Sequence, residues 1–222
     1  MTCATRGWSP ADTSETAASL SPWCLSRTKR LFDLASAALV LIVLWPVLLL
    51  LGLLVKTTSS GPALFRQNRV GKDGREFTLL KFRTMTYNRS DAGPGVTTQG
   101  DSRITAIGRA LRKWKLDELP QFINVLAGNM SLVGPRPDLA EFWAMLSPDQ
   151  RPTLCLRPGI TGRATLEFRD EEAILCKVPQ EQLTEYYLRS VLPEKIRLDW
   201  EYAKQANFMT DCKILVTTLR RI

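Results

Sequence analysis

The 222-residue sequence contains no histidine. A chain without histidine cannot build the Ser–His or Cys–His pairs of nucleophilic enzymes, and it lacks the commonest side chain that binds transition metals. Any chemistry in this protein must therefore use carboxylates and the cations of lysine and arginine, together with a hard metal ion if a metal takes part.

Cysteine is also scarce, and its five copies are scattered along the chain as Cys3, Cys24, Cys155, Cys176 and Cys212. Their number is odd and no two of them have the Cys-x-x-Cys spacing. The sequence therefore indicates neither a disulfide framework nor a zinc site, and we expect free thiols in a reducing compartment.

Negative charge is in short supply, because 30 lysines and arginines face 22 aspartates and glutamates for a formal net charge of +8. Such a surplus suits ligands that carry phosphate, an anionic membrane surface, or nucleic acid. The basic residues are dispersed, and no motif known to read nucleic acid accompanies them. We therefore expect no nucleic-acid partner.

One long apolar run covers residues 35–55 and holds 21 uncharged residues. As a helix it would measure about 31 Å, which matches the hydrocarbon thickness of a bilayer. We expect this segment to lie in a membrane. A cleavable signal peptide would be shorter and would end at a clearer cleavage site than Thr58-Ser59-Ser60-Gly61.

Pro46 lies near the centre of the apolar run, where it removes a backbone hydrogen bond and predicts a kink or break. Basic residues stand on both flanks, with Lys29 and Arg30 before the run and Lys56 and Arg66 after it. This symmetry favours export of neither end and suits a re-entrant segment with both ends in the cytoplasm. Prolines also occur in spanning helices, so the residues alone leave a single-pass anchor open.

Beyond the apolar run, the segments 63–70 and 75–83 flank the turn Gly71-Lys72-Asp73-Gly74 and predict a short β-hairpin. Periodic patterns predict an amphipathic helix at 104–115, a helix from Pro120 to about Gly128, and helices at 181–190, 194–206 and 211–221. Segments 134–137 and 157–159 predict rigid turns that present Arg136 and Arg157. The polar face of the first helix is interpreted as a solvated or headgroup-facing surface and holds Arg109, Arg112, Lys113 and Lys115.

Asp117 and Glu118 stand side by side directly before the helix that begins at Pro120. In a structural interpretation, acids at a helix N-terminus cap free amides and offset the helix dipole. In a functional interpretation, two adjacent carboxylates among many cations can hold Mg²⁺, and an ionised aspartate can attack phosphorus. The residues alone leave both interpretations open.

Several segments, taken in order, resemble the bacterial sugar transferase family, the monotopic polyprenol-phosphate phosphoglycosyl transferases, over about residues 29–219. The resemblance comes from the number of matches in one order, because each match alone would be weak. The matching segments are Lys29-Arg30-Leu31-Phe32-Asp33, Pro46, Lys81-Phe82-Arg83-Thr84-Met85, Asp101-Ser102-Arg103-Ile104-Thr105, Leu116-Asp117-Glu118-Leu119-Pro120-Gln121, Met130-Ser131-Leu132-Val133-Gly134-Pro135-Arg136-Pro137 and Arg157-Pro158-Gly159-Ile160-Thr161-Gly162.

The resemblance implies that Asp117 is a nucleophile, that Glu118 is its partner, that Mg²⁺ binds close to both, and that the Pro46 segment is re-entrant. Members of the family transfer a phosphosugar from a nucleotide-sugar, here expected to be a UDP-sugar, to polyprenyl phosphate. The phosphosugar passes through the aspartate, and a nucleoside monophosphate is released. Cations would offset the repulsion between carboxylate and phosphate, and the candidates are Lys81, Arg83, Arg103 and Arg136. Of these, Arg83 and Arg136 can instead be structural.

We therefore expect an α+β, mainly helical fold with a re-entrant membrane helix, a compact cytoplasmic domain with a short β-hairpin, and interfacial amphipathic helices. The expected divisions are a flexible tail at 1–26, a basic-flanked membrane helix at 27–56 and a catalytic domain at 57–222. The expected place is the bacterial inner membrane, with the catalytic domain facing the cytoplasm among membrane lipids; a homodimer is compatible with this. The alternative is a non-enzymatic, membrane-bound scaffold or adaptor in which Asp117 and Glu118 only cap a helix.

Overall fold

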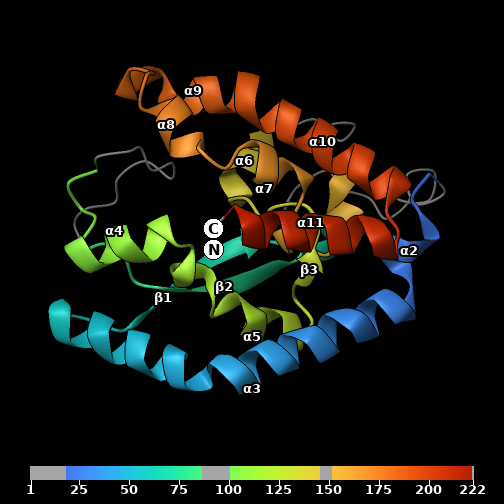
Figure 1. The fold of residues 1–222 in the computed structure, drawn as a ribbon. Helices are drawn as coiled ribbons and strands as arrows, with labels where there is room; N and C mark the ends of the chain where they lie inside the picture. Colours follow the sequence, from blue (N-terminus) through green and yellow to red (C-terminus); the bar gives the residue numbers. More distant parts are fainter. Residues whose placement is uncertain (1–18, 87–100, 146–151, 222) are drawn as a thin grey trace.

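The computed structural model describes residues 19–86, 101–145 and 152–221, and helices predominate in it (Figure 1). Two small sheets of two strands each accompany the helices in these residues, which confirms the expected α+β, mainly helical class. In chain order the elements are α2 (Pro22–Leu25), α3 (Arg27–Thr58), β1 (Leu64–Val70), β2 (Glu76–Phe82), α4 (Ala106–Lys113), α5 (Gln121–Leu126), β3 (Ser131–Val133), α6 (Ala140–Met145), β4 (Gly159–Thr161), α7 (Arg163–Glu167), α8 (Glu171–Leu175), α9 (Leu183–Tyr186), α10 (Leu192–Gln205) and α11 (Phe208–Arg220).

The predicted β-hairpin is confirmed, with β1 and β2 antiparallel from the pair Leu64–Phe82 to the pair Val70–Glu76. Its turn places Asp73 in the left-handed region at φ 58°, a conformation that aspartate tolerates better than most residues. Asn124 of α5 closes the other side of β2, because its side chain accepts from the Leu80 N–H and donates to the Thr78 carbonyl. The hairpin is thereby fixed to the segment that follows Asp117 and Glu118.

The second sheet pairs β3 with β4 in parallel, Ser131 opposite Gly159 and Val133 opposite Thr161. Of the two segments interpreted as rigid turns, 134–137 directly follows β3 and 157–159 leads into β4. That interpretation missed the pairing of the two strands. A Cβ atom on Gly159 would lie 2.2 Å from the Gly134 nitrogen, which only a glycine can avoid. The pairing continues past β3, because the Gly134 N–H donates to the Thr161 carbonyl and the Gly159 N–H donates to the Pro135 carbonyl, which fixes the backbone directly before Arg136.

Helix α3 is continuous over 32 residues, about 48 Å, and contains Pro46. Figure 1 shows it bowed along one side of the molecule, so the predicted kink or break takes the form of a bend in an unbroken helix. Among the described residues it is the one helix long and apolar enough to cross a membrane. Its ends are packed, with Ala37 and Val55 buried, whereas Leu39 and Ile42 between them are 62% and 70% exposed.

The residues directly before α3 belong to the folded body. Leu20 is buried against a cluster that includes Leu156 and Ala203, and the Ser21 N–H donates to the Ala203 carbonyl over 2.9 Å. Of the predicted tail at 1–26, residues 19–26 therefore pack on the folded body, and residues 1–18 lie outside the described residues.

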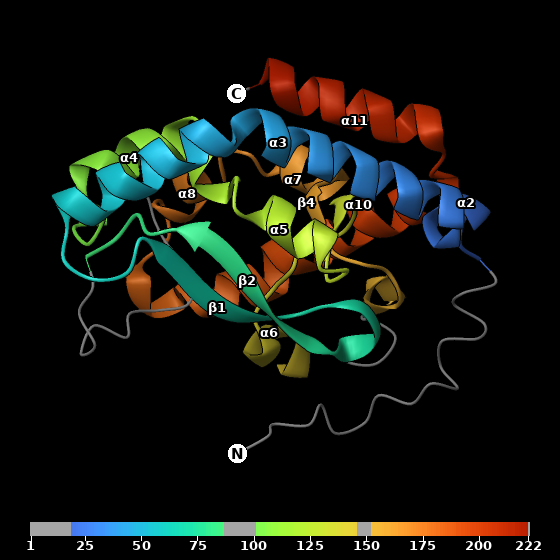
Figure 2. The same cartoon turned by 90° about the horizontal axis from the view of Figure 1, so that it is seen from below.

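The C-terminal helices form where the sequence predicted them, with different boundaries. A π-helical turn at Tyr187–Val191 joins α9 to α10, so the first two predicted helices are continuous. A capping box of Asn207 and Thr210 starts α11. Figure 2 shows α3, α4 and α11 along one side of the molecule and the β1–β2 hairpin on the other.

Candidate active site

Asp117 and Glu118 lie in a single 3-10 turn, Leu116–Glu118, between α4 and α5. The turn is tight because Lys115, directly before it, adopts the left-handed conformation at φ 53°. This reversal directs the acids toward the hairpin and the segment after β3. Asp117 is only 6% exposed.

Glu118 is held by two cations from distant parts of the chain. Its Oε1 accepts from Lys81 Nζ of β2 over 3.0 Å and from Arg136 Nη2 over 2.9 Å. Burial raises the pKa of the Glu118 carboxyl, but the charges of Arg136 and Lys81 outweigh burial and hold the pKa well below its ordinary value. Glu118 is thus ionised and holds two cations beside Asp117.

Asp117 differs from its neighbour in having an open acceptor. Its Oδ1 is buried and has no hydrogen-bond partner among the residues that the structure describes. An acceptor buried in this way costs about 1–3 kcal/mol unless a ligand satisfies it. Burial, followed by the negative charge of Glu118, raises the pKa of Asp117 above its ordinary value. Once ionised, this carboxylate is more basic than a solvated aspartate.

Arg112 is a member of the site that the sequence prediction missed. Its Nε donates to Thr84 Oγ1 over 2.9 Å, its Nη1 donates to Glu172 Oε1 over 2.8 Å, and its charge acts on Asp117. The sequence pattern places Arg112 on a solvated or headgroup-facing surface. A useful signal was its place in the last turn of α4, because the reversal at Lys115 folds the acids back beside that turn.

The four cations predicted to bind phosphate are divided by the structure. Lys81 and Arg136 meet at Glu118. Arg83 instead donates to backbone carbonyls in the last turn of α3 and just after it, those of Val55, Ser59 and Pro62.

Arg103 forms a two-pronged ion pair with Asp101, with Nη2 2.6 Å from Oδ2. The structure therefore places Arg83 at the end of α3 and pairs Arg103 with Asp101.

The expected Mg²⁺ can be tested against the donors that are present. The described ranges contain no group of three or more acids or thiols that could enclose a metal. Magnesium rarely requires such a cage, since it takes one or two protein carboxylates and completes its shell with substrate phosphate and water. The unpartnered Oδ1 of Asp117 beside Glu118 fits that donor set.

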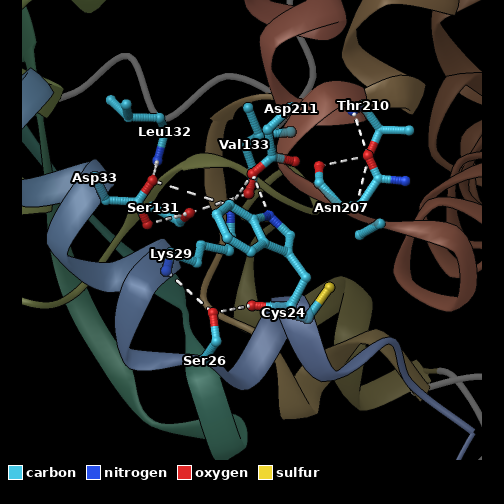
Figure 3. A network of polar contacts seen from close by, with 12 residues as sticks. Cys24, Ser26, Lys29, Asp33, Ser131, Leu132, Val133, Asn207, Thr210 and Asp211 are labelled. Atoms are coloured by element: carbon cyan, nitrogen blue, oxygen red, sulfur yellow. Dashed lines mark hydrogen bonds and ion pairs between the residues drawn. The ribbon is translucent and has the colours of Figure 1, made fainter.

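A buried polar network fixes the first turns of α3 to the rest of the protein (Figure 3). Lys29 Nζ lies 2.5 Å from Asp211 Oδ2 of α11, and Asp211 also accepts from the Tyr202 hydroxyl and the Trp23 indole. This ion pair joins α3 directly to α11.

Four residues along α3 from Lys29, Asp33 accepts from Ser131 Oγ over 2.7 Å and from the Leu132 N–H over 3.2 Å. These residues begin β3, whose continuation delivers Arg136 to Glu118. The apolar helix and the acid–cation cluster are therefore joined by one short path of backbone.

A family model described as bacterial sugar transferase matches residues 24–222. The chain belongs to the bacterial sugar transferase family. This confirms the resemblance that the ordered segments carried. The part matched includes α3, both acids and all the cations described above.

Three relatives show how this bacterial sugar transferase compares with known proteins. It is 37% identical over 195 residues to the UDP-glucose:undecaprenyl-phosphate glucose-1-phosphate transferase of Escherichia coli (strain K12), covering 86% of this chain and 39% of the relative. It is 35% identical over 199 residues to the UDP-N-acetylgalactosamine-undecaprenyl-phosphate N-acetylgalactosaminephosphotransferase of Aeromonas hydrophila, covering 87% and 43%. It is 37% identical over 194 residues to the uncharacterized sugar transferase EpsL of Bacillus subtilis (strain 168), covering 87% and 86%. The chain thus spans about two fifths of the first two relatives and most of the third.

Proposed function

We propose that this bacterial sugar transferase moves a phosphosugar from a UDP-sugar to polyprenyl phosphate, giving polyprenyl-diphosphate-sugar and a nucleoside monophosphate. The observation that carries the proposal is the contrast between two adjacent buried acids. Glu118 is occupied by Lys81 and Arg136, and Asp117 keeps an oxygen open. The names of the E. coli and Aeromonas relatives support the two substrate classes and leave the sugar unassigned.

In the first step, a carboxylate oxygen of Asp117 attacks the phosphorus that carries the sugar. A bond forms between that oxygen and phosphorus, and the bond from phosphorus to the bridging oxygen of the nucleotide breaks. The nucleoside monophosphate leaves with the bridging oxygen and its electron pair, and the phosphosugar stays on Asp117. Asp117 rather than Glu118 takes this role because its Oδ1 is not held by a cation.

The cations of the cluster make an attack of one anion on another feasible. Lys81 and Arg136 surround Glu118, and the charge of Arg112 acts on Asp117. Fixed positive charge in a buried site stabilises the charge that spreads over phosphoryl oxygens in the transition state. Mg²⁺, which Asp117 and Glu118 would hold, supplies further positive charge to the diphosphate when bound.

In the second step, a phosphate oxygen of the carrier lipid attacks the same phosphorus, and the bond to Asp117 breaks. The Asp117 carboxylate is regenerated, and the lipid leaves as the diphosphate-linked sugar. The attacking oxygen is already anionic near neutral pH, so no general base has to remove a proton. A reaction of this kind suits a chain without histidine.

We also propose that α3 is re-entrant, with both ends on the cytoplasmic face of the inner membrane. Its two packed ends, at Ala37 and Val55, contact the same body. A helix that crossed a bilayer would hold these ends on opposite sides of it. Helix α11 lies on the same side of the molecule as α3 (Figure 2). Its exposed apolar side chains, with Met209 at 71% and Leu219 at 72%, suit an interfacial helix.

The testing experiment measures UMP release by the detergent-purified chain given Mg²⁺, undecaprenyl phosphate and a panel of UDP-sugars. Asp117→Asn should abolish release. Asp73→Asn is the matched control, because the same change falls in the hairpin turn at a left-handed position that asparagine tolerates. Turnover by Asp117→Asn at the wild-type rate would exclude the covalent role. A folded wild-type chain that is inactive with every sugar would favour the scaffold interpretation.

A further inference from the structure

A polar pocket lies at the start of α3, apart from the acid–cation cluster. It is formed between the first turns of α3, the strand β3 and the turn at Arg157. Neither acid of the cluster lines it, nor do Lys81 and Arg136. Its polar lining includes Lys29, Arg30, Asp33, Ser131, Arg157 and Tyr202.

Two arginines that line this pocket are each held by backbone carbonyls. Arg30 donates from Nη2 to the Val125 carbonyl over 2.7 Å and from Nη1 to the Met130 carbonyl over 3.1 Å. Arg157 donates from Nε to the Gly128 carbonyl over 3.0 Å. All three acceptors lie between the end of α5 and the residue before β3, so both guanidinium groups are held by the same short segment.

These contacts hold the two arginines in place without neutralising them, because carbonyl oxygens carry no net charge. No ion pair to an acid forms at Arg30 or Arg157 within the described part of the chain. Asp33 lines the same pocket and its charge acts on Arg30, but its carboxylate accepts hydrogen bonds from Ser131 and Leu132 rather than from either arginine. The two positive charges repel each other, and each guanidinium keeps N–H groups that these bonds do not use.

The place of the pocket indicates which anion would meet it. Arg30 stands in the first turn of α3, and the uncharged run of the same helix starts just beyond Asp33. A residue at this position on a membrane-inserted helix lies at the level of the lipid headgroups, where phosphate is the abundant anion. Guanidinium groups bind phosphate oxygens with paired, charge-assisted hydrogen bonds.

We propose that Arg30 and Arg157 bind the phosphate of an anionic phospholipid headgroup, at a site separate from the acids. The shared chemistry is a phosphate group, and the source we assign is the membrane lipid rather than free phosphate. The bound headgroup adds a second negative charge to a pocket in which two arginines face one aspartate, and it seats the start of α3 at the bilayer surface. This proposal rests on the proposed insertion of α3 in the membrane and does not depend on the transfer reaction.

Native mass spectrometry of the full chain in detergent, titrated with phosphatidylglycerol, tests the proposal. Arg157→Gln should weaken binding about tenfold, the effect of losing a charge-assisted hydrogen-bond pair. Arg157→Lys keeps the positive charge but lacks the planar guanidinium group, so its affinity for the lipid should lie between those of the wild type and Arg157→Gln. It also serves if Arg157→Gln does not fold. Arg27→Gln removes an exposed charge at the same end of α3 and should change binding by less than twofold.

Three outcomes would overturn the proposal. Equal losses in Arg27→Gln and Arg157→Gln would mean diffuse attraction to the lipid rather than a site. Loss of the lipid in Arg136→Gln would place it at the acid–cation cluster. Displacement of phosphatidylglycerol by an equal concentration of inorganic phosphate would assign the site to free phosphate, whereas retention at a large excess of phosphate supports the lipid source.

Discussion

Arg136 Nη2 donates to Glu118 Oε1 over 2.9 Å, which joins the segment after β3 to the turn before α5. Lys81 reaches the same oxygen from the hairpin. One carboxylate oxygen therefore gathers two cations from opposite sides, and Asp117 is left beside them with an open oxygen. The asymmetry between two neighbouring acids is the feature from which the proposed chemistry follows.

Arg136→Gln should reduce UMP release about 100-fold, a loss typical when one fixed donor that stabilises developing charge is removed. The remaining cation at Glu118 would be Lys81. Arg197→Gln is the matched control, since that arginine pairs with Glu194 and Glu201 on the exposed side of α10. Steady-state rates of both variants with the active UDP-sugar give the comparison. An Arg136→Gln rate within threefold of wild type would refute the assigned role.

Asp199 should make the stability of the protein depend on pH between about 4 and 7. Burial raises the pKa of this carboxyl from 3.8 to about 7, because the folded state favours the neutral form. The sign follows: the group is neutral in both states below pH 4, and its contribution to stability is lost as pH rises toward 7, by at most about 4 kcal/mol.

Asp199→Asn keeps an oxygen that can accept from the Ala164 N–H and cannot ionise. Thermal unfolding of variant and wild type is measured in the same detergent at pH 4, 5.5 and 7. The Tm of Asp199→Asn relative to that of the wild type should increase as the pH rises. A difference independent of pH would show that Asp199 does not titrate in this range.

Lys29→Met should destabilise the protein by about 3–5 kcal/mol, because it leaves the fully buried Asp211 without its cation. Asp211→Asn should cost a similar amount. The double variant should lose much less than the sum of the two, since it leaves no uncompensated charge. Thermal melts of the three variants complete the cycle, and additive losses would mean that the 2.5 Å contact is not energetically coupled.

Single cysteines at Thr28 and Thr57 test the re-entrant course of α3, in a chain whose native cysteines are replaced by serine. Both positions are exposed and stand at opposite ends of the helix. A membrane-impermeant maleimide should label both in inside-out vesicles and neither in intact cells. A cysteine at Val43, in the exposed apolar middle, should stay unlabelled in both. Labelling of the two ends from opposite sides would establish a spanning helix instead.

The sequence predicted the elements whose signal is local. The hairpin around Gly71–Gly74 and the apolar helix depend on turn chemistry and on composition, both readable within a short window. The pair β3–β4 was missed because each strand has three residues and the pairing joins Ser131 to Gly159, far apart in the chain. Strands this short show no alternation that a pattern can detect.

The cations show the same limit at the level of the site. Lys81 and Arg83 are two residues apart, so a continuous strand would direct them to one face. The strand ends at Phe82, and Arg83 turns to the carbonyls at the end of α3 instead. Sequence patterns selected basic residues in the right segments. Only the three-dimensional path of the backbone separates those that meet the acids from those that hold the helix.

The separation of Lys81 from Arg83 fixes one distance within the protein. Arg83 donates to the carbonyl of Ser59 at the end of α3, and Lys81 donates to Glu118. About 7 Å of extended chain separates Lys81 from Arg83. The height of the acids above the end of the apolar helix is therefore set by one strand of fixed length. In the proposed reaction, this fixed distance would hold the Asp117 carboxylate at one level relative to the end of α3, whatever the tail length of the carrier lipid.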